Sequence, residues 1–229
     1  MSSAEWAIVL LSLRVSLVAV LVSLPLAYAI AWVLARRRFP GVIVLDALVH
    51  LPLVLPPVVT GWILLIAFGR SGAIGAWLYE TFGVTLVFSW TGAALAAAVM
   101  ALPLMVRAMR LSIEAVDRRL VGAARTLGAS RWKAFLTITL PLSIPGIAAG
   151  AMLGFARSLG EFGATITFAA NIAGETRTLP LAIYTGLQTP GGEEAVTRLA
   201  VISIVLSLGA LLLSEWLVRR SQGGRAHVL

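Results

Sequence analysis

The sequence predicts an all-α, polytopic integral membrane protein, with about five transmembrane helices in one domain, residues 1–229. Of its residues, 59% are hydrophobic and only 12% are charged, and the mean hydropathy is +0.96. Soluble domains carry about 25% charged residues. Apolar stretches of about 20 residues, the length that crosses a bilayer, recur along the chain, and arginines gather at their ends. This pattern places the whole chain in a lipid bilayer.

Composition also excludes several classes of function. The net charge of +8 does not indicate nucleic-acid binding, because the basic residues lie at the ends of apolar stretches and not on one polar surface. With no cysteine and two histidines, thiolate and histidine-rich metal sites are not expected. The only lysine, Lys133, lies between Trp132 and Ala134, so the chain has no Gly-Lys-Ser/Thr phosphate loop. ATP, if it is used, must be bound by another polypeptide.

The first predicted span covers residues 6–34 and ends at the cluster Arg36 to Arg38. Arg14 lies near its start, where a long side chain reaches the membrane interface, and Pro25 lies in its interior. Arginine gathers on the cytoplasmic side of membrane proteins. The cluster therefore predicts a cytoplasmic end for this span and an N-terminus outside.

The second predicted span, residues 46–68, contains Pro52, Pro56, Pro57 and Gly61. Each proline removes an N–H donor and crowds the carbonyl four residues earlier, so a continuous helix is not expected. In a bilayer, other helices or water must satisfy the freed groups. Two interpretations remain open: a kinked helix that only packs, or a broken segment that borders a transport pathway, with Pro56 and Pro57 as candidate pathway residues.

A glycine-rich connector, residues 69–84, is predicted as an outer loop with a short interfacial helix. The third predicted span, residues 87–106, is rich in alanine, and small residues let another helix approach closely. Arg107 and Arg110 follow it and predict a cytoplasmic exit.

The longest basic segment, residues 114–141, follows the third span. An apolar stripe with helical spacing over residues 120–127 predicts one short helix, Gly128 closes it, and Ser130 caps a second helix. Pro141 is expected to take the preceding residue out of helical dihedral angles and to stop or kink the second helix. The segment is either a loop made basic to fix orientation or a docking element.

The fourth predicted span, residues 142–170, carries glycine at every fourth position, at Gly146, Gly150 and Gly154. Such a stripe allows a neighbouring helix to pack backbone to backbone. We therefore expect a close helix contact along this face.

Arg157 and Glu161 follow the glycine stripe at i, i+4 spacing inside the same apolar stretch. Charges within a membrane cost a few kcal/mol each and usually face a bundle interior or water. One interpretation is a structural salt bridge. The other is an anion pathway in which Glu161 offsets the charge of Arg157, and Ser158, Thr165 and Thr167 add hydroxyl donors.

The segment 171–198 is the longest predicted outer loop, and its part 179–187 is either a short helix or a re-entrant segment. The last predicted span, residues 199–218, ends at Arg219-Arg220. These arginines predict a cytoplasmic C-terminus.

The residue order in the basic segment resembles the signature of ATP-binding-cassette importer permeases: Glu-Ala-Ala, three residues, Gly, nine residues, Ile-x-Leu-Pro. The matching positions are Ala123, Ala124, Gly128, Ile138, Leu140 and Pro141, and Arg125 and Ala129 lie within the motif. The resemblance implies coupling helices that dock on a separate ATPase subunit. Gly122 stands where the family has glutamate, so this chain lacks that carboxylate for docking.

Blocks over nearly the whole chain resemble the permeases of bacterial molybdate importers. They are RRRFPG (36–41), LPLVLPPVVTG (51–61), ARTLGASRW (124–132), ARSLGEFGATITF (156–168), GETRTLP (174–180) and QTPGGE (188–193). The first three are shared in some form with sulfate permeases, whereas the last two are more similar to the molybdate branch. The choice between molybdate and tungstate rests largely on the binding protein of such systems.

The resemblance implies an inner-membrane homodimer that works with two ATPase subunits and a periplasmic or surface oxyanion-binding protein. ATP and Mg would be bound by the ATPase, with no cofactor and no metal in this chain. Alternatives are a sulfate/thiosulfate permease, an ion-coupled secondary transporter and a membrane anchor. A secondary transporter usually has internal repeats, which we do not find, and an anchor gives no reason for Arg157 and Glu161.

Overall fold

The computed structural model describes residues 2–37 and 39–223, and every regular element within them is helical, which confirms the predicted all-α class. In chain order these are α1 (Ser3–Arg36), α2 (Val42–Val54), α3 (Pro57–Phe68), α4 (Ala73–Phe82), α5 (Trp90–Glu114), α6 (Arg118–Thr126), α7 (Arg131–Ala134), a π-helical turn (Phe135–Thr139), α8 (Leu140–Leu159), α9 (Gly163–Phe168), α10 (Leu179–Leu187) and α11 (Glu193–Gly223). Arg38 of the arginine cluster and the C-terminal tail from residue 224 lie outside the described residues.

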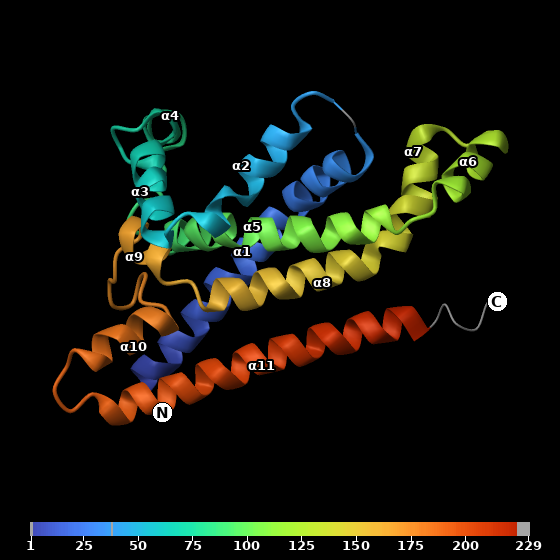
Figure 1. Cartoon of the computed structure of the whole chain (residues 1–229). Coiled ribbons are helices and arrows are strands. Elements are labelled where there is room, and N and C mark those ends of the chain that lie inside the picture. The colour runs from blue at the N-terminus through green and yellow to red at the C-terminus, as the bar shows by residue number, and fades with distance from the viewer. Residues whose placement is uncertain (1, 38, 224–229) are drawn as a thin grey trace.

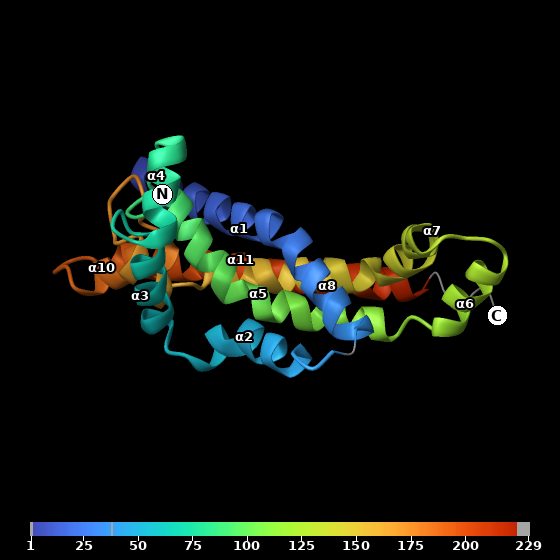
Figure 2. The same cartoon turned by 90° about the horizontal axis from the view of Figure 1, so that it is seen from above.

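The helix α5 lies between α1 and α8, and α11 runs alongside α8 (Figures 1 and 2). The helices α6 and α7 project from the end of the bundle at which α11 ends, and at the other end the N-terminus lies near α10 (Figure 1). We call these the α6–α7 end and the α10 end. The helices thus hold the basic segment far from the predicted outer loop.

Four stretches in the described residues are long and apolar enough to cross a membrane: Ser3–Arg36, Trp90–Glu114, Arg131–Leu159 and Glu193–Leu213. The pair α2 and α3 meets the same criteria together but is bent by 115°. Counting the bent pair as one span gives the five spans that the sequence predicts. The bend lies at Leu55 and Pro56, where the prolines were expected to break the helix.

Small residues bring α5 close to its two neighbours, as the sequence predicts. On the side of α1, Ala93 and Ala97 are fully buried. On the side of α8, a Cβ on Gly146 would lie 2.1 Å from the Cβ of Ser112, and one on Gly154 would lie 2.7 Å from the Cγ of Met105. Only glycine therefore permits this approach of α8 to α5.

The fourth span is shorter than the predicted 142–170, because α8 ends at Leu159 and a separate helix, α9, begins at Gly163. The reason is tertiary packing of α9 on α3. A Cβ on Gly61 would lie 2.7 Å from the carbonyl oxygen of Ala164, and one on Gly163 would lie 2.7 Å from the Cβ of Pro57. The apolar residues of 160–170 do not reveal this break, and its local signals are Gly160, which caps α8, and Gly163, which begins α9.

The predicted outer loops contain the short helices α4 and α10, so the interpretation of residues 179–187 as a helix is confirmed. The N–H of Leu179 donates to Ser12 Oγ at 2.7 Å, which fixes the start of α10 on α1. Arg198 of α11 forms an ion pair with the buried Glu5, with 2.9 Å between Nη2 and Oε1. Arg14, predicted to reach the interface, stacks on the Trp90 ring with 3.7 Å from its Cζ to the ring centroid.

Candidate coupling loop and translocation site

The basic segment folds as the predicted helix-turn-helix. Asp117 Oδ1 accepts from the N–H of Arg119 and caps α6, and Ser130 Oγ accepts from the N–H of Lys133 at 3.1 Å and caps α7. Between them Gly128 has φ +88°, in the left-handed region that glycine adopts without strain. The glycine therefore sets the angle between the two helices.

The loop presents an uncovered apolar surface within this chain. No residue of α6 is buried, and its stripe ends at Leu127, which is 89% exposed. Trp132 on α7 is 67% exposed. Around Gly122 a Cβ would meet nothing within 4 Å, so the position that lacks the family's glutamate lies in open space. A folded helical pair with exposed apolar side chains is suited to docking on another protein.

The remaining predicted coupling residues follow the same surface into α8. Ala123, Arg125 and Pro141 are exposed, and Ala124, Ala129, Ile138 and Leu140 are partly exposed. The expectation for Pro141 was wrong: Leu140 keeps helical angles, φ −61° and ψ −52°, and the helix continues from α7 into α8. The π-helical turn explains this continuity, because Leu140 N–H donates to the Phe135 carbonyl and Pro141 falls in the first turn of α8.

Two anchors that sequence reasoning missed join this loop to α1. Arg36 Nη2 donates to the carbonyl oxygens of Ile113 at 3.0 Å and Val116 at 3.1 Å, at the end of α5. Phe135 packs against Trp32, with ring centroids 6.1 Å apart, and stacks on Trp132 at 5.3 Å. The RRRFPG block marked Arg36 only as an orientation signal, because a carbonyl partner far along the chain leaves no trace in the sequence.

A second candidate site forms where the two helix breaks meet. The α2–α3 break and the α8–α9 break enclose a hollow of about 350 Å³. Its lining includes Pro57, Arg157, Glu161 and Phe162. The structure thus brings together the proline break and the charge pair, for each of which a pathway role was one of two interpretations of the sequence.

The charge pair joins the end of α8 to the start of α9. Arg157 Nη1 lies 2.6 Å from Glu161 Oε2, and the Glu161 side chain is 2% exposed against 25% for Arg157. The other carboxylate oxygen, Oε1, accepts from the N–H of Ala164 at 2.8 Å. Glu161 therefore offsets the charge of Arg157 and also satisfies a backbone donor in the first turn of α9. Their i, i+4 spacing had indicated one continuous helix. In the structure Arg157 lies in α8, and Glu161 lies between α8 and α9.

The other predicted pathway residues are close by but do not line the hollow. Thr165 is fully buried, and Thr167 Oγ1 donates to the carbonyl oxygen of Gly163 at 2.8 Å. Ser158 Oγ is buried without a hydrogen-bond partner among the described residues. Pro56 stands at the start of α3, next to the lining residue Pro57.

These features define a membrane transport permease: a bundle of spanning helices with a charge pair at a break and an exposed helical loop. The chain belongs to the family described as binding-protein-dependent transport system inner membrane component, whose model matches residues 9–223.

Among curated proteins the chain is similar to the molybdenum transport system permease protein ModB of Escherichia coli (strain K12). The two are 62% identical over 96% of this chain and 97% of that protein. ModB of Haemophilus influenzae is 60% identical over 93% of each chain. The sulfate transport system permease protein CysT of Escherichia coli is 40% identical over 86% of this chain and 70% of that protein.

Two solved structures share the fold. An amino acid ABC transporter crystallised with histidines has a TM-score of 0.66 and 21% identity, over 95% of this chain and 94% of that chain. A bacterial ABC transporter for alginate import has a TM-score of 0.74 and 18% identity, over 96% of this chain and 80% of that chain.

Proposed function

We propose that this chain is the translocation subunit of an ATP-binding-cassette importer and carries molybdate across the cytoplasmic membrane. The observation that carries the proposal is the 62% identity to ModB of Escherichia coli over nearly the full length of both chains. The sulfate permease CysT is less similar, at 40% over a smaller share of each chain. This difference favours molybdate over sulfate.

The partners follow from the same proposal. A second copy of the chain completes the permease, and two ATPase subunits dock on the exposed loop around Gly128. ATP and Mg bind to the ATPase, and this chain holds no cofactor and no metal. A periplasmic or surface oxyanion-binding protein delivers the anion. In support, one neighbouring structure contains an alginate transporter in complex with a periplasmic protein.

In the proposed orientation the α6–α7 end lies in the cytoplasm and the N-terminus lies outside. Arginines gather at the α6–α7 end: Arg36 and Arg37 at the end of α1, Arg107 and Arg110 on α5, and the basic residues of α6 and α7. Positive charge of this kind marks the cytoplasmic side of a span.

In this scheme the hollow at the two helix breaks forms part of the anion route. Arg157 supplies a positive charge to an oxyanion, and the buried Glu161, at 2.6 Å, offsets it. A route that is polar but not strongly attractive admits an anion and releases it, because tight binding would slow its exit.

The proposal is tested by reconstituting the chain in proteoliposomes with the ATPase and binding protein of a molybdate importer. We expect ATP-dependent uptake of radiolabelled molybdate that excess tungstate reduces more strongly than excess sulfate. A permease reconstituted without the ATPase provides the control. Uptake of sulfate in preference to molybdate, or uptake driven by an ion gradient without ATP, contradicts the proposal.

A further inference from the structure

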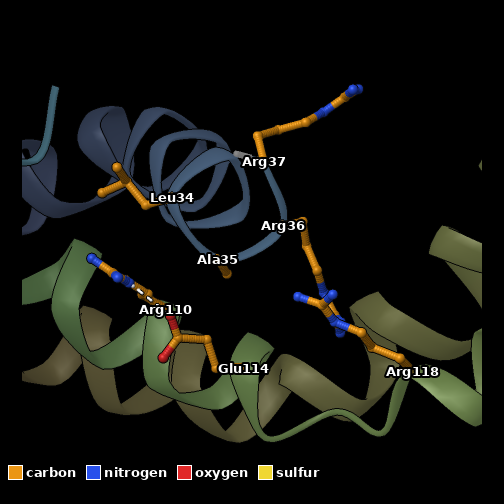
Figure 3. A pocket seen from close by; sticks show the side chains of 7 residues that line it. All are labelled: Leu34, Ala35, Arg36, Arg37, Arg110, Glu114 and Arg118. Atoms are coloured by element: carbon orange, nitrogen blue, oxygen red, sulfur yellow. Dashed lines mark hydrogen bonds and ion pairs between the residues drawn. The ribbon is translucent and has the colours of Figure 1, made fainter. Parts of the chain in front are cut away.

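A basic hollow at the α6–α7 end is separate from the translocation site. It has a volume of about 530 Å³ and lies between the ends of α1 and α5 and the start of α6. Four arginines line it, Arg36, Arg37, Arg110 and Arg118, against one carboxylate, Glu114. Arg36 and Arg118 point toward one another, whereas Arg37 points away from them (Figure 3).

The single carboxylate is already paired. Arg110 Nε donates to Glu114 Oε1 at 2.8 Å, and Arg110 Nη1 lies 3.1 Å from Asp46 Oδ2. Neither Arg36 nor Arg118 forms an ion pair with a carboxylate among the described residues. The positive charge of this facing pair is therefore not neutralised by this part of the chain.

The guanidinium group of Arg36 is anchored by hydrogen bonds and, within the described part of the chain, keeps two of its nitrogen donors unused. Its Nη2 is bound to the carbonyl oxygens of Ile113 and Val116, which are neutral groups. In the described residues its Nε and Nη1 make no hydrogen bond, and they stay available to a ligand. Two facing guanidinium groups repel each other unless an anion lies between them, and their planar forks fit tetrahedral oxyanions.

The surroundings favour a lipid as the source of that anion. The hollow is also lined by Leu34 and Ala35, at the end of a membrane-spanning helix. Arg37 lies over the Trp32 ring, with 5.3 Å from its Cζ to the ring centroid. Tryptophan and arginine at a helix end are typical of the headgroup level of a bilayer. A phospholipid would place its phosphate between the arginines and its glycerol region against the apolar lining.

We propose that Arg36 and Arg118 bind a phosphate-type tetrahedral oxyanion, supplied by the headgroup of an anionic phospholipid. The bound group joins the end of α1 to the first residue of α6, and so ties the coupling loop to the membrane surface. Phosphatidylglycerol and a free oxyanion share this chemistry, and the experiment separates them.

The test uses the full chain in phosphatidylcholine nanodiscs, titrated with phosphatidylglycerol in one arm and with inorganic phosphate in the other. Because a nanodisc offers both leaflets, the result does not depend on which end of the bundle faces the cytoplasm. We compare the native chain with Arg118→Gln, and use Arg119→Gln, an exposed arginine of the same helix outside the hollow, as the matched control. Bound lipid is counted by native mass spectrometry, and phosphate by calorimetry.

We expect Arg118→Gln to weaken phosphatidylglycerol binding roughly five-fold, the effect of one arginine near an anionic lipid, and Arg119→Gln to leave it unchanged. Arg118→Lys keeps the positive charge but loses the planar guanidinium group, so its affinity for phosphatidylglycerol should lie between those of the native chain and Arg118→Gln. An Arg118-dependent effect seen only with inorganic phosphate supports the site with a free oxyanion as its ligand. The proposal is overturned if the binding of neither phosphatidylglycerol nor inorganic phosphate responds to Arg118→Gln.

Discussion

Arg36 at the end of α1 donates a hydrogen bond of 3.0 Å to the carbonyl oxygen of Ile113, in the last turn of α5. The same Nη2 reaches Val116 beyond the end of that helix. The Ile113 carbonyl also accepts from the N–H of Val116 at 3.3 Å, and a cation near a helix C-terminus is favourable. The contact therefore fixes the hinge between the bundle and the coupling loop.

We predict that Arg36→Gln loosens this hinge. Losing hydrogen bonds from a charged donor costs roughly 1.5–3 kcal/mol each, so backbone amides at residues 113–120 should exchange faster with deuterium. Coupling of ATP hydrolysis to transport should fall as well. Arg107→Gln, at an exposed arginine of the same end, is the control and should change neither. Unchanged exchange in Arg36→Gln would show that the two carbonyls do not depend on the arginine.

Two glycines in spanning helices, Gly146 in the stripe of α8 and Gly209 on α11, give predictions of opposite sign. Gly146→Ala places a Cβ 2.1 Å from that of Ser112, and such overpacking costs typically about 1–3 kcal/mol. At Gly209 on α11 a Cβ meets nothing within 4 Å in this chain, so Gly209→Ala should raise stability slightly through helix propensity. Thermal unfolding of the purified permease measures both. A stable Gly146→Ala variant would mean that α5 and α8 can separate without cost.

The turn of the coupling loop is tested at Gly128. A β-branched residue rarely adopts the observed φ of +88°, so Gly128→Val should cost about 1–3 kcal/mol locally. Transport-stimulated ATP hydrolysis should fall while membrane insertion survives. Asparagine adopts left-handed dihedral angles more readily than valine, so Gly128→Asn should lose less of the transport-stimulated ATP hydrolysis. Gly122→Ala, in open space with helical angles, is the control. Equal coupling in all three would exclude the turn as a coupling device.

The orientation is tested by labelling, since the chain has no cysteine. Single cysteines at Arg131, on α7, and at Gln188, after α10, both replace exposed residues at opposite ends of the bundle. In right-side-out vesicles an impermeant maleimide should label Gln188→Cys at once and Arg131→Cys only after lysis. Labelling of both from the same side would contradict the five-span arrangement.

Local patterns predicted much of this structure. Glycine at every fourth position predicted the α5–α8 contact, the prolines of the second span predicted that its helix is interrupted, and Gly128 with Ser130 predicted the turn. These features depend on residues close together in the chain. The end of α8 at Leu159 and the role of Arg36 were not predictable in this way, because each depends on partners far along the sequence: α3 for the first and the carbonyl oxygens of Ile113 and Val116 for the second.

The charge pair at the two breaks is the last test, and its geometry makes Glu161→Gln informative. Glutamine keeps a carbonyl oxygen that can accept from the N–H of Ala164, so the start of α9 stays satisfied while the negative charge is lost. If the pair lines the anion route, the unmasked Arg157 should hold molybdate, and uptake should slow while expression stays normal. A purely structural pair behaves differently, because stranding one buried charge costs roughly 3 kcal/mol and lowers the amount of folded protein.

The double variant Arg157→Gln with Glu161→Gln separates these cases. A structural pair can be replaced by two neutral amides, so the double variant should regain stability and transport together. A pathway pair cannot, because the route then lacks the positive charge that admits the anion, and uptake should stay low in a stable protein. Expression and molybdate uptake in vesicles are measured for both single variants and the double. A stable double variant with full uptake would remove Arg157 and Glu161 from the pathway.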